Sequence, residues 1–140
     1  KGSGFLADVC EAWEQPVKEL GPKVSERQVI LRISLVLDGD GGFLGEVVPI
    51  FKLGVGGPLG DGEQWMSWIH RTDLCRLIAV ALEDPAWTGV VNGVAPEPVR
   101  MGAFATALGR SLGRPSLLPV PGPVLQLLLG DGARVVLDPP

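Results

Sequence analysis

The residues of this 140-residue chain that are best suited to chemistry lie in one stretch, residues 54–73, with the sequence GVGGPLGDGEQWMSWIHRTD. It joins a glycine-rich loop to a short aromatic strand that ends at the only histidine, His70. Glycines let a backbone approach a ligand closely, and a histidine can exchange a proton near neutral pH. We therefore predict that Gly56, Gly57, Trp68 and His70 line a substrate pocket.

The position of His70 in the strand suggests a direction for its side chain. Side chains alternate between the two faces of a strand. Met66, Trp68 and His70 are therefore expected on one face, and Trp65, Ser67 and Ile69 on the other. Ligands of open α/β sheets gather at the carboxyl edge of the strands, where His70 would lie, so we expect its face to point toward the pocket. No acid or nucleophile is fixed beside it in the sequence, which favours a packed histidine bonded to backbone over a catalytic one.

Two other binding motifs fail on physical grounds. The glycines of residues 54–60 superficially match a dinucleotide fingerprint, but a phosphate cradle needs a strand before the loop and a helix after it, and here the order is reversed. Asp38 and Asp40 suggest a calcium loop, yet Phe43 stands where glycine is required and Pro49 where a bidentate glutamate belongs.

The sequence contains few residues that could bind a metal ion. The chain has two cysteines, Cys10 and Cys75, without a CxxC motif or a neighbouring histidine. A structural zinc site needs about four ligands, so we expect no metal and two buried free thiols. Such thiols suit a reducing compartment.

The elements that must position these residues follow from hydrophobic periodicity. An apolar helical pattern over residues 5–20, from Phe5 to Leu20, predicts a helix that Pro16 should kink or break. Residues 28–37 are so continuously apolar that they predict one central parallel strand covered on both faces. Within it, Arg32 needs a carboxylate, a cluster of carbonyls or a ligand, because an unpaired buried guanidinium is costly.

The rest of the chain alternates helices and short strands. We expect a helix over residues 43–53, and then an apolar helix that is capped by Thr72, covered on both sides and closed by Pro85. A strand over residues 89–92 and a helix from Met101 to Leu112, with a strong stop at residues 113–115, should follow. Short apolar segments are predicted at residues 117–120, 124–129 and 133–137.

Composition sets the broad class. Hydrophobic residues make up 46% and charged residues 20%, which indicates a globular core. A net charge of −4 without basic runs argues against binding to nucleic acid. The sequence shows neither a signal peptide nor the roughly 20 continuous apolar residues of a transmembrane segment.

Three segments together resemble one family. They are LRISLVL around Arg32, GVGGPLGDGEQWMSWIHRTDL, and VVNGVAPEPVRMGAFATALGRSLGRPSLLPVP. They are similar to the atypical extended short-chain dehydrogenase/reductases, an epimerase-like family with bacterial members of unassigned substrate and a plastid branch known as giant chloroplast. The closer likeness to the plastid branch implies a plastid location, in the stroma or a membrane-associated complex, with the bacterial cytoplasm as the alternative.

The resemblance implies an α/β fold, namely the C-terminal part of a Rossmann-like NAD(P)-binding fold with a small mixed substrate-side lobe. The dinucleotide-binding N-terminal half is expected to be absent. Residues 1–140 would form one partial domain, with late Rossmann-like elements and the glycine loop in residues 1–84 and the small lobe in residues 85–140. The cofactor of the family is NAD(P), and Ser34, Leu35 and Val36 would line its nicotinamide end.

The same resemblance implies lost chemistry. The Tyr and Lys that exchange the substrate proton in the family would correspond to Leu6 and Cys10, followed by Glu14, and the chain contains no Tyr. An arginine that clamps sugar-nucleotide phosphates would correspond to Met66. His70 and Asp73 match the IH-x-x-D signature of the family, in which the acid often orients its helix.

Three hypotheses remain open at this point. The chain is the C-terminal part of an NAD(P)-dependent oxidoreductase or epimerase-like protein, a non-catalytic scaffold or assembly subunit, or a nucleotide-binding regulator. In each case, the helix of residues 5–20 should be covered by another polypeptide, either the missing half or a partner, and a dimer or larger assembly is possible. We expect the 140 residues alone not to bind NAD(P).

Overall fold

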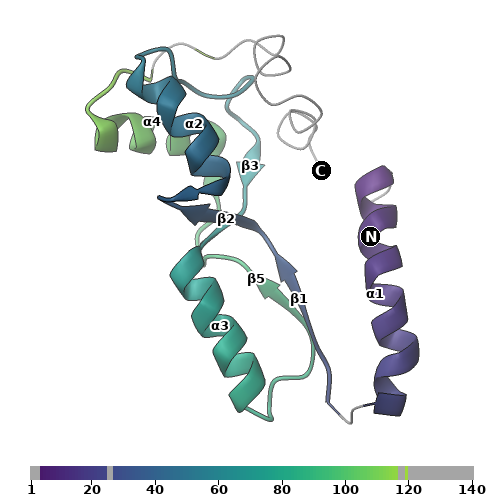
Figure 1. Ribbon diagram of the computed structural model, residues 1–140. Coiled ribbons are helices and arrows are strands. Elements are labelled where there is room, and N and C mark those ends of the chain that lie inside the picture. The colour runs from purple at the N-terminus through teal and green to yellow at the C-terminus, as the bar shows by residue number, and fades with distance from the viewer. Residues whose placement is uncertain (1–3, 25–26, 117–118, 120–140) are drawn as a thin grey trace. The chain divides into compact units, whose positions relative to one another are not determined.

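The computed structural model describes residues 4–24, 27–116 and 119 (Figure 1). These residues form an α/β segment, in which short strands alternate with helices. The predicted apolar segments at residues 124–129 and 133–137, and most of residues 117–120, lie outside the described residues. The elements are α1 (Phe5–Val24), β1 (Val29–Ile33), β2 (Leu35–Asp38), α2 (Gly42–Lys52), β3 (Trp65–Met66), β4 (Trp68–His70), α3 (Arg71–Glu83), β5 (Gly89–Gly93), β6 (Val99–Arg100) and α4 (Met101–Leu112).

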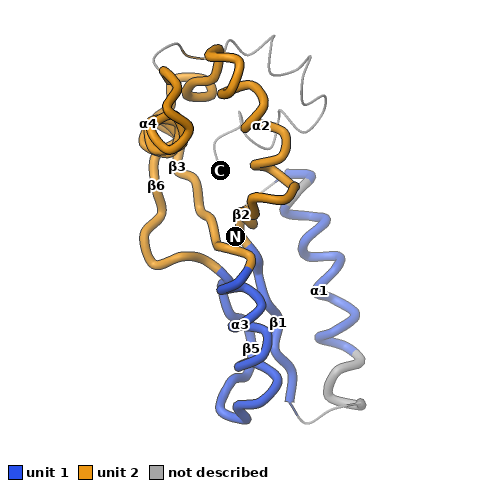
Figure 2. Tube along the Cα trace, turned by 60° about the vertical axis from the view of Figure 1, so that its left-hand side comes forward, with its two compact units in different colours: residues 1–33, 72–93, 140 blue, residues 34–71, 94–139 orange. Residues whose placement is uncertain are grey.

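The chain divides into two compact units that interleave along the sequence (Figure 2). Unit 1 comprises residues 1–33 and 72–93, and unit 2 comprises residues 34–71 and 94–139. These boundaries differ from the expected division into residues 1–84 and 85–140, because each unit is built from segments that are distant in sequence.

Unit 1 contains a parallel strand pair and two helices, of which α1 precedes β1 in sequence and α3 precedes β5. β1 pairs with β5 in a register that runs from Val29 opposite Gly89 to Ile33 opposite Gly93. The predicted strand at residues 89–92 is thereby confirmed. α3 ends at Glu83, before Pro85 as expected, but it is not covered on both sides within the described residues, because Ile78, Val80 and Leu82 are exposed.

Unit 2 holds the hydrophobic core of the described residues. Leu59, Met66 and Met101 form a buried cluster, and Leu35, Trp68, Val99 and Phe104 pack against it. β2 pairs with β4 in parallel, and β3 pairs with β6 antiparallel. α2 adds the buried side chains of Val47 and Phe51.

The boundaries of α2 and α4 follow their sequence signals. α4 runs from Met101 to Leu112 and ends at Gly113, which adopts the left-handed conformation with φ 62°. α2 spans Gly42–Lys52 with Pro49 inside it. Both helices confirm the expected elements.

Three local expectations are wrong. The expected break at Pro16 is absent, since α1 continues through Pro16 to Val24, while the alternative of a kink there stays a prediction. Residues 28–37 form two strands separated at Ser34, since β1 and β2 pair with different partners, and their side chains are half-buried or exposed. α3 begins at Arg71, so Thr72 lies inside its first turn instead of capping it.

The strand that leaves the glycine loop is also interrupted. It breaks at Ser67 into β3 and β4, which pair with β6 and β2 respectively. Met66 and Trp68 both contact the unit 2 cluster, as the expected alternation requires. Ile69 is buried and Trp65 is exposed, so the other face is not uniform.

Candidate functional site

The carboxyl ends of β2 and β4 bring polar side chains together. Leu37 lies opposite His70 in the parallel register, and Asp38 and Arg71 follow directly. The Arg71 guanidinium forms an ion pair with the Asp38 carboxylate, and its second nitrogen lies 3.8 Å from the Asp40 carboxylate. This edge is the one where ligands of parallel sheets gather, and it carries both acidic and basic groups.

His70 is exposed at this edge. The expected packing of His70 is therefore wrong for the described residues, whereas its expected hydrogen bond to backbone stays a prediction. An exposed imidazole at the end of β4 is accessible to a ligand or to another polypeptide. Its role in a substrate pocket stays a prediction.

Trp68 lies two residues before His70 in β4 and packs against the core of unit 2. Its ring is half-buried beside the Leu59–Met66–Met101 cluster, and its indole N–H donates a hydrogen bond to the Glu97 carbonyl oxygen at 3.2 Å. Leu35 lies directly opposite it in the register. The structure thus brings together one residue predicted for the cofactor and one predicted for the substrate pocket.

Ser34, Leu35 and Val36 are half-buried where the chain leaves β1 and enters β2. The Leu35 N–H donates to the Ser67 carbonyl oxygen at 3.3 Å, so the two strand breaks face each other. This backbone supplies a mostly apolar wall, which suits an uncharged ring better than a phosphate group.

The glycine-rich loop is packed against its own unit. Gly56 and Gly57 are buried, and a Cβ added at Gly56 would stand 2.4 Å from the Phe51 ring and 2.8 Å from the Phe51 Cα. Gly62 has φ +76° and accepts a hydrogen bond from the Gly102 N–H at 2.8 Å, and the Met101 N–H donates to the Gln64 carbonyl at 3.0 Å. The loop therefore occupies the N-terminus of α4, a position that could otherwise bind an anion.

A strand, glycine turn and helix do occur in this chain, at the turn whose sequence suggested only a calcium loop. β2 leads through Gly39, Gly41 and Gly42 into α2, whose N-terminus has no side-chain cap. However, Asp38 and Asp40 stand in this turn, and their carboxylates disfavour an anionic pyrophosphate at a helix N-terminus. The described residues therefore do not fit the pyrophosphate of a dinucleotide here.

Arg32 has a carboxylate partner, one of the three kinds of partner expected from its sequence, although its side chain is 56% exposed and not buried. Its guanidinium donates to both oxygens of Glu14 in α1, at 2.7 Å from Nε and 2.9 Å from Nη2. Lys18 adds an ion pair to Glu14 at 3.0 Å. The hydrogen bonds from Arg32 and Lys18 lower the pKa of Glu14 from 4.5 to about 2, and the same pair raises the pKa of Arg32.

The two cysteines are free, as expected, but their expected burial is wrong. Cys10 and Cys75 are free but exposed, on α1 and α3. The described residues contain no group of three or more His, Cys, Asp or Glu side chains that could hold a metal ion. None of the described helices is sufficiently long and apolar to cross a membrane.

Two arginines that the sequence patterns did not single out organise the backbone. Arg27 donates to carbonyl oxygens at the end of α3, at 2.5 Å to Ala81 and 2.9 Å to Leu82. Arg100 stacks 3.9 Å from the centre of the exposed Trp65 ring and bonds to the Glu63 carbonyl. No sequence signal names such partners, because backbone carbonyls are present at every residue.

Comparison with known proteins places these features in a family. No family model matches the chain. It is 49% identical over 137 residues to an Arabidopsis thaliana protein, "Epimerase family protein SDR39U1 homolog, chloroplastic", covering 98% of this chain and 39% of that protein. It is 38% identical over 133 residues to human epimerase family protein SDR39U1, covering 45% of it.

Solved structures of epimerase family proteins are also similar to this chain. The human SDR39U1 structure with NADPH superposes with a TM-score of 0.73 at 41% identity, over 79% of this chain and 38% of the other. A nucleoside-diphosphate sugar epimerase from Corynebacterium glutamicum gives a TM-score of 0.63 at 32% identity, over 91% of this chain and 28% of the other. At 21% identity, a Thermus thermophilus UDP-glucose 4-epimerase shares the fold.

The chain is thus related to the epimerase family proteins of the SDR39U1 type over nearly its whole length. This relation confirms the epimerase-like family expected from the sequence motifs. The chain spans about 40% of the length of these relatives.

Proposed function

We propose that this chain is the C-terminal segment of an NAD(P)-binding epimerase- or oxidoreductase-like protein that works without the standard Tyr and Lys pair. The observation that carries the proposal is its likeness to the human relative solved with NADPH, at 41% identity and a TM-score of 0.73. The remaining part of a Rossmann-like fold would supply the phosphate-binding turn. This segment would supply the wall beside the nicotinamide.

The chemistry of the described residues indicates which part of the cofactor this segment would contact. Ser34, Leu35 and Val36 form a half-buried, mostly apolar stretch that suits a nicotinamide ring. The acidic turn of Asp38 and Asp40 and the occupied N-terminus of α4 suit no pyrophosphate. NAD(P) would supply hydride chemistry when bound, and the residues of this chain would orient its ring.

Proton transfer by the side chains of α1 is disfavoured. Efficient acid or base catalysis needs a pKa near the working pH, whereas Arg32 and Lys18 hold the pKa of Glu14 at about 2. The position expected for a catalytic Lys holds Cys10. His70 is then the exposed group of this segment best suited to contact a substrate, together with Trp68 and the Gly56 and Gly57 loop as the pocket wall.

A non-catalytic role as scaffold or assembly subunit is the second candidate. It is favoured by one face of α1, where Phe5 is 79% and Trp13 76% exposed, with Val17 beside them. Apolar surface of this kind marks an interface, so we propose that another polypeptide covers α1, in a dimer or a larger complex. A plastid location is supported by the A. thaliana relative, which is described as chloroplastic.

Titration with NADPH tests the proposal. The full-length protein should quench or shift NADPH fluorescence in a saturable manner, and the 140-residue chain alone should not. Saturable NADPH binding by the isolated chain would contradict the proposal that the phosphate-binding turn lies in the remaining part of the protein. Full-length protein that neither binds NADPH nor retains it through purification would favour the scaffold.

A further inference from the structure

The ends of β2 and β4, where the proposed substrate site lies, carry an excess of negative charge. Residues 35–42 and 68–71 include two carboxylates, Asp38 and Asp40, and only one lysine or arginine, Arg71. Both carboxylates pair with the Arg71 guanidinium, and the Asp40 side chain is 86% exposed. Two carboxylates beside one guanidinium leave one net negative charge, which repels an anionic ligand at short range.

The N-termini of α2, α3 and α4 do not suit a diphosphate either. An anion binds at a helix N-terminus through N–H groups that have no other partner. The turn before α2 holds the two aspartates, and the first turn of α3 holds Asp73. At the N-terminus of α4, the Gly102 N–H already donates to the Gly62 carbonyl oxygen at 2.8 Å.

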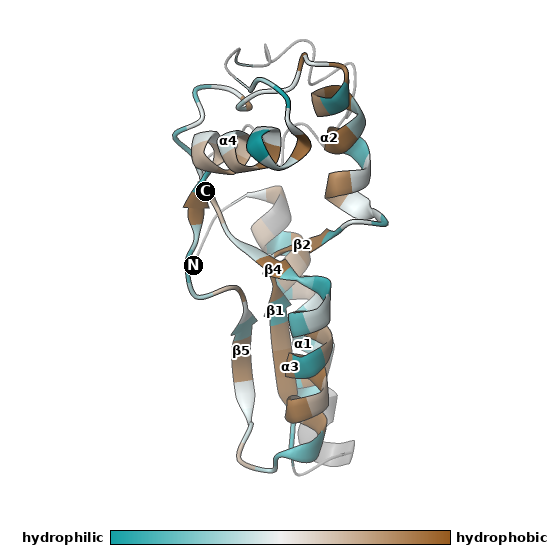
Figure 3. Cartoon of the chain, turned by 90° about the vertical axis from the view of Figure 1, so that its left-hand side faces the viewer, coloured by the Kyte–Doolittle hydropathy of each residue, from teal (hydrophilic) through white to brown (hydrophobic). Residues whose placement is uncertain are grey.

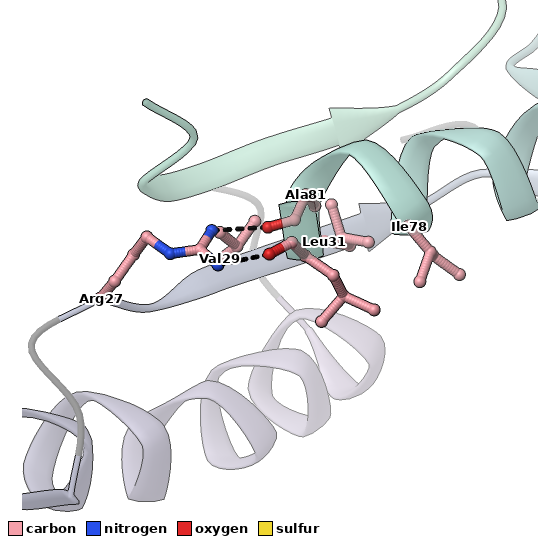
Figure 4. A pocket seen from close by; sticks show the side chains of 6 residues that line it. Arg27, Val29, Leu31, Ile78 and Ala81 are labelled. Carbon is pink, nitrogen blue, oxygen red and sulfur yellow. Dashed lines mark hydrogen bonds between the residues drawn. The ribbon is translucent and has the colours of Figure 1, made fainter. Parts of the chain in front are cut away.

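Two arginines in other parts of the described chain have structural partners. In unit 1, Arg27 borders a pocket of about 210 Å³ that is otherwise lined by apolar side chains of β1 and α3. Figure 4 shows its guanidinium beside the Ala81 carbonyl oxygen, to which it donates a hydrogen bond. In unit 2, Arg100 stacks on Trp65 and bonds the Glu63 carbonyl. These guanidinium groups order the backbone in preference to binding phosphate.

The side chains beside the acidic turn are apolar. Leu35 and Val36 of β2 and Trp68 of β4 are half-buried, and Figure 3 shows β2 in brown where it leads to the turn before α2. Met66, at the position that the family resemblance assigns to a phosphate-clamping arginine, is 6% exposed and lies in the hydrophobic cluster of unit 2. An apolar wall with few polar groups suits an uncharged ligand.

We propose that this site takes an uncharged, largely apolar carbonyl or alcohol compound as its substrate, and that the charge of Asp38 and Asp40 excludes nucleoside diphosphate sugars. The inference rests on the proposed function, because it names the substrate class of the same site and because carbonyl and alcohol groups are the partners of a nicotinamide cofactor. Leu35 and Trp68 would contact the apolar body of the substrate, and the exposed His70 imidazole would contact its oxygen.

Probe binding to the full-length protein tests the substrate class. Uridine 5′-diphosphate (UDP) serves as the anionic probe and 2-acetonaphthone, a planar uncharged ketone, as the neutral probe. Both would be titrated by saturation-transfer NMR in the presence of excess NADPH, which keeps UDP out of a dinucleotide site. We expect saturable binding of the ketone and none of UDP at concentrations up to about 1 mM. Saturable binding of UDP in this range would overturn the inference.

A matched pair of substitutions tests the role of the charge. Asp40→Lys and Glu46→Lys make the same charge change at exposed positions of unit 2, the first in the acidic turn and the second inside α2. Asp40→Lys should raise the affinity for UDP about tenfold, because it turns a repulsion at contact distance into an attraction. Glu46→Lys should raise it less than about twofold, because salt screens a more distant charge. Equal gains would overturn the inference.

The outcomes separate this inference from the proposed function. Saturable UDP binding by the NADPH-saturated protein would overturn the substrate class and leave NADPH binding intact. Protein that binds no NADPH would count against the proposed function, and the comparison of the two lysine variants would still test the charge exclusion. If neither probe binds the unsubstituted protein, a gain in UDP affinity confined to Asp40→Lys supports the inference, and the absence of such a gain overturns it.

Discussion

Arg32 and Glu14 form a bidentate ion pair that joins β1 to α1 within unit 1. The Nε and Nη2 groups of Arg32 donate to the two carboxylate oxygens at 2.7 and 2.9 Å, and the Glu14 side chain is only 11% exposed. Paired geometry of this kind is stronger than a single charged contact. The pair therefore orders the long helix that opens the chain.

Acid should loosen α1. The pKa of Glu14 is lowered from 4.5 to about 2, so its ionised form stabilises the folded state above pH 4.5, and this contribution is lost as the pH falls toward 2. Hydrogen exchange of α1, measured across this window, should show opening in the native chain. Glu14→Gln should remove the pH dependence, whereas Glu19→Gln, which alters an exposed side chain of the same helix, should retain it.

Gly56→Ala should destabilise unit 2. The new Cβ would lie 2.4 Å from the Phe51 ring and 2.8 Å from its Cα, and the backbone contact cannot be relieved by rotating the ring. We expect a loss of about 1–3 kcal/mol in the free energy of unfolding, measured by denaturant titration.

Gly45→Ala is the matched control for the glycine loop. Gly45 lies in α2, and a Cβ added there would have no neighbouring atom within 4 Å, so alanine should be neutral or should stabilise by up to about 1 kcal/mol. Equal stability of the two alanine variants would show that Gly56 is not closely packed.

Arg27→Met should free the end of α3. The guanidinium donates to the carbonyls of Ala81 and Leu82, and a hydrogen bond to a charged group contributes about 1.5–3 kcal/mol net of its exchange with water. We expect a loss of about 1–3 kcal/mol and faster exchange in the last turn of α3. Arg76→Gln alters a surface ion pair in which Arg76 is 75% and Asp73 is 61% exposed, and it should change stability by less than about 0.5 kcal/mol.

His70→Gln should leave the stability of the full-length protein nearly unchanged, within about 0.5 kcal/mol, because the side chain is exposed. A thermal melt and a turnover or ligand-binding assay on the same preparation separate structure from function. A drop in melting temperature comparable to that of Gly56→Ala would show that the assembled protein buries His70. Lost ligand binding with unchanged melting would assign it to the pocket.

Local pattern in the sequence was sufficient for several elements. The spacing of Met101, Phe104, Leu108 and Leu112, followed by Gly113, determined α4, because helix periodicity and a left-handed glycine cap are local properties. The apolar run around Arg32 indicated parallel pairing, although as one strand and not two, and it indicated that Arg32 needs a carboxylate, a cluster of carbonyls or a ligand, since a guanidinium without a partner is costly in such a run. The run GGPLGDGEQWMSWIH was specific enough to indicate the family.

Tertiary structure decided the partners. Arg32 pairs with Glu14, and the Phe51 ring packs against Gly56. Neither contact could be predicted from the sequence, because local periodicity does not show which segments lie next to each other in the fold. The breaks at Ser34 and Ser67 arose where one apolar run pairs with two different strands. The exposure of Cys10, Cys75 and His70 likewise depends on which surfaces are packed against them, whereas periodicity specifies only that a face is apolar.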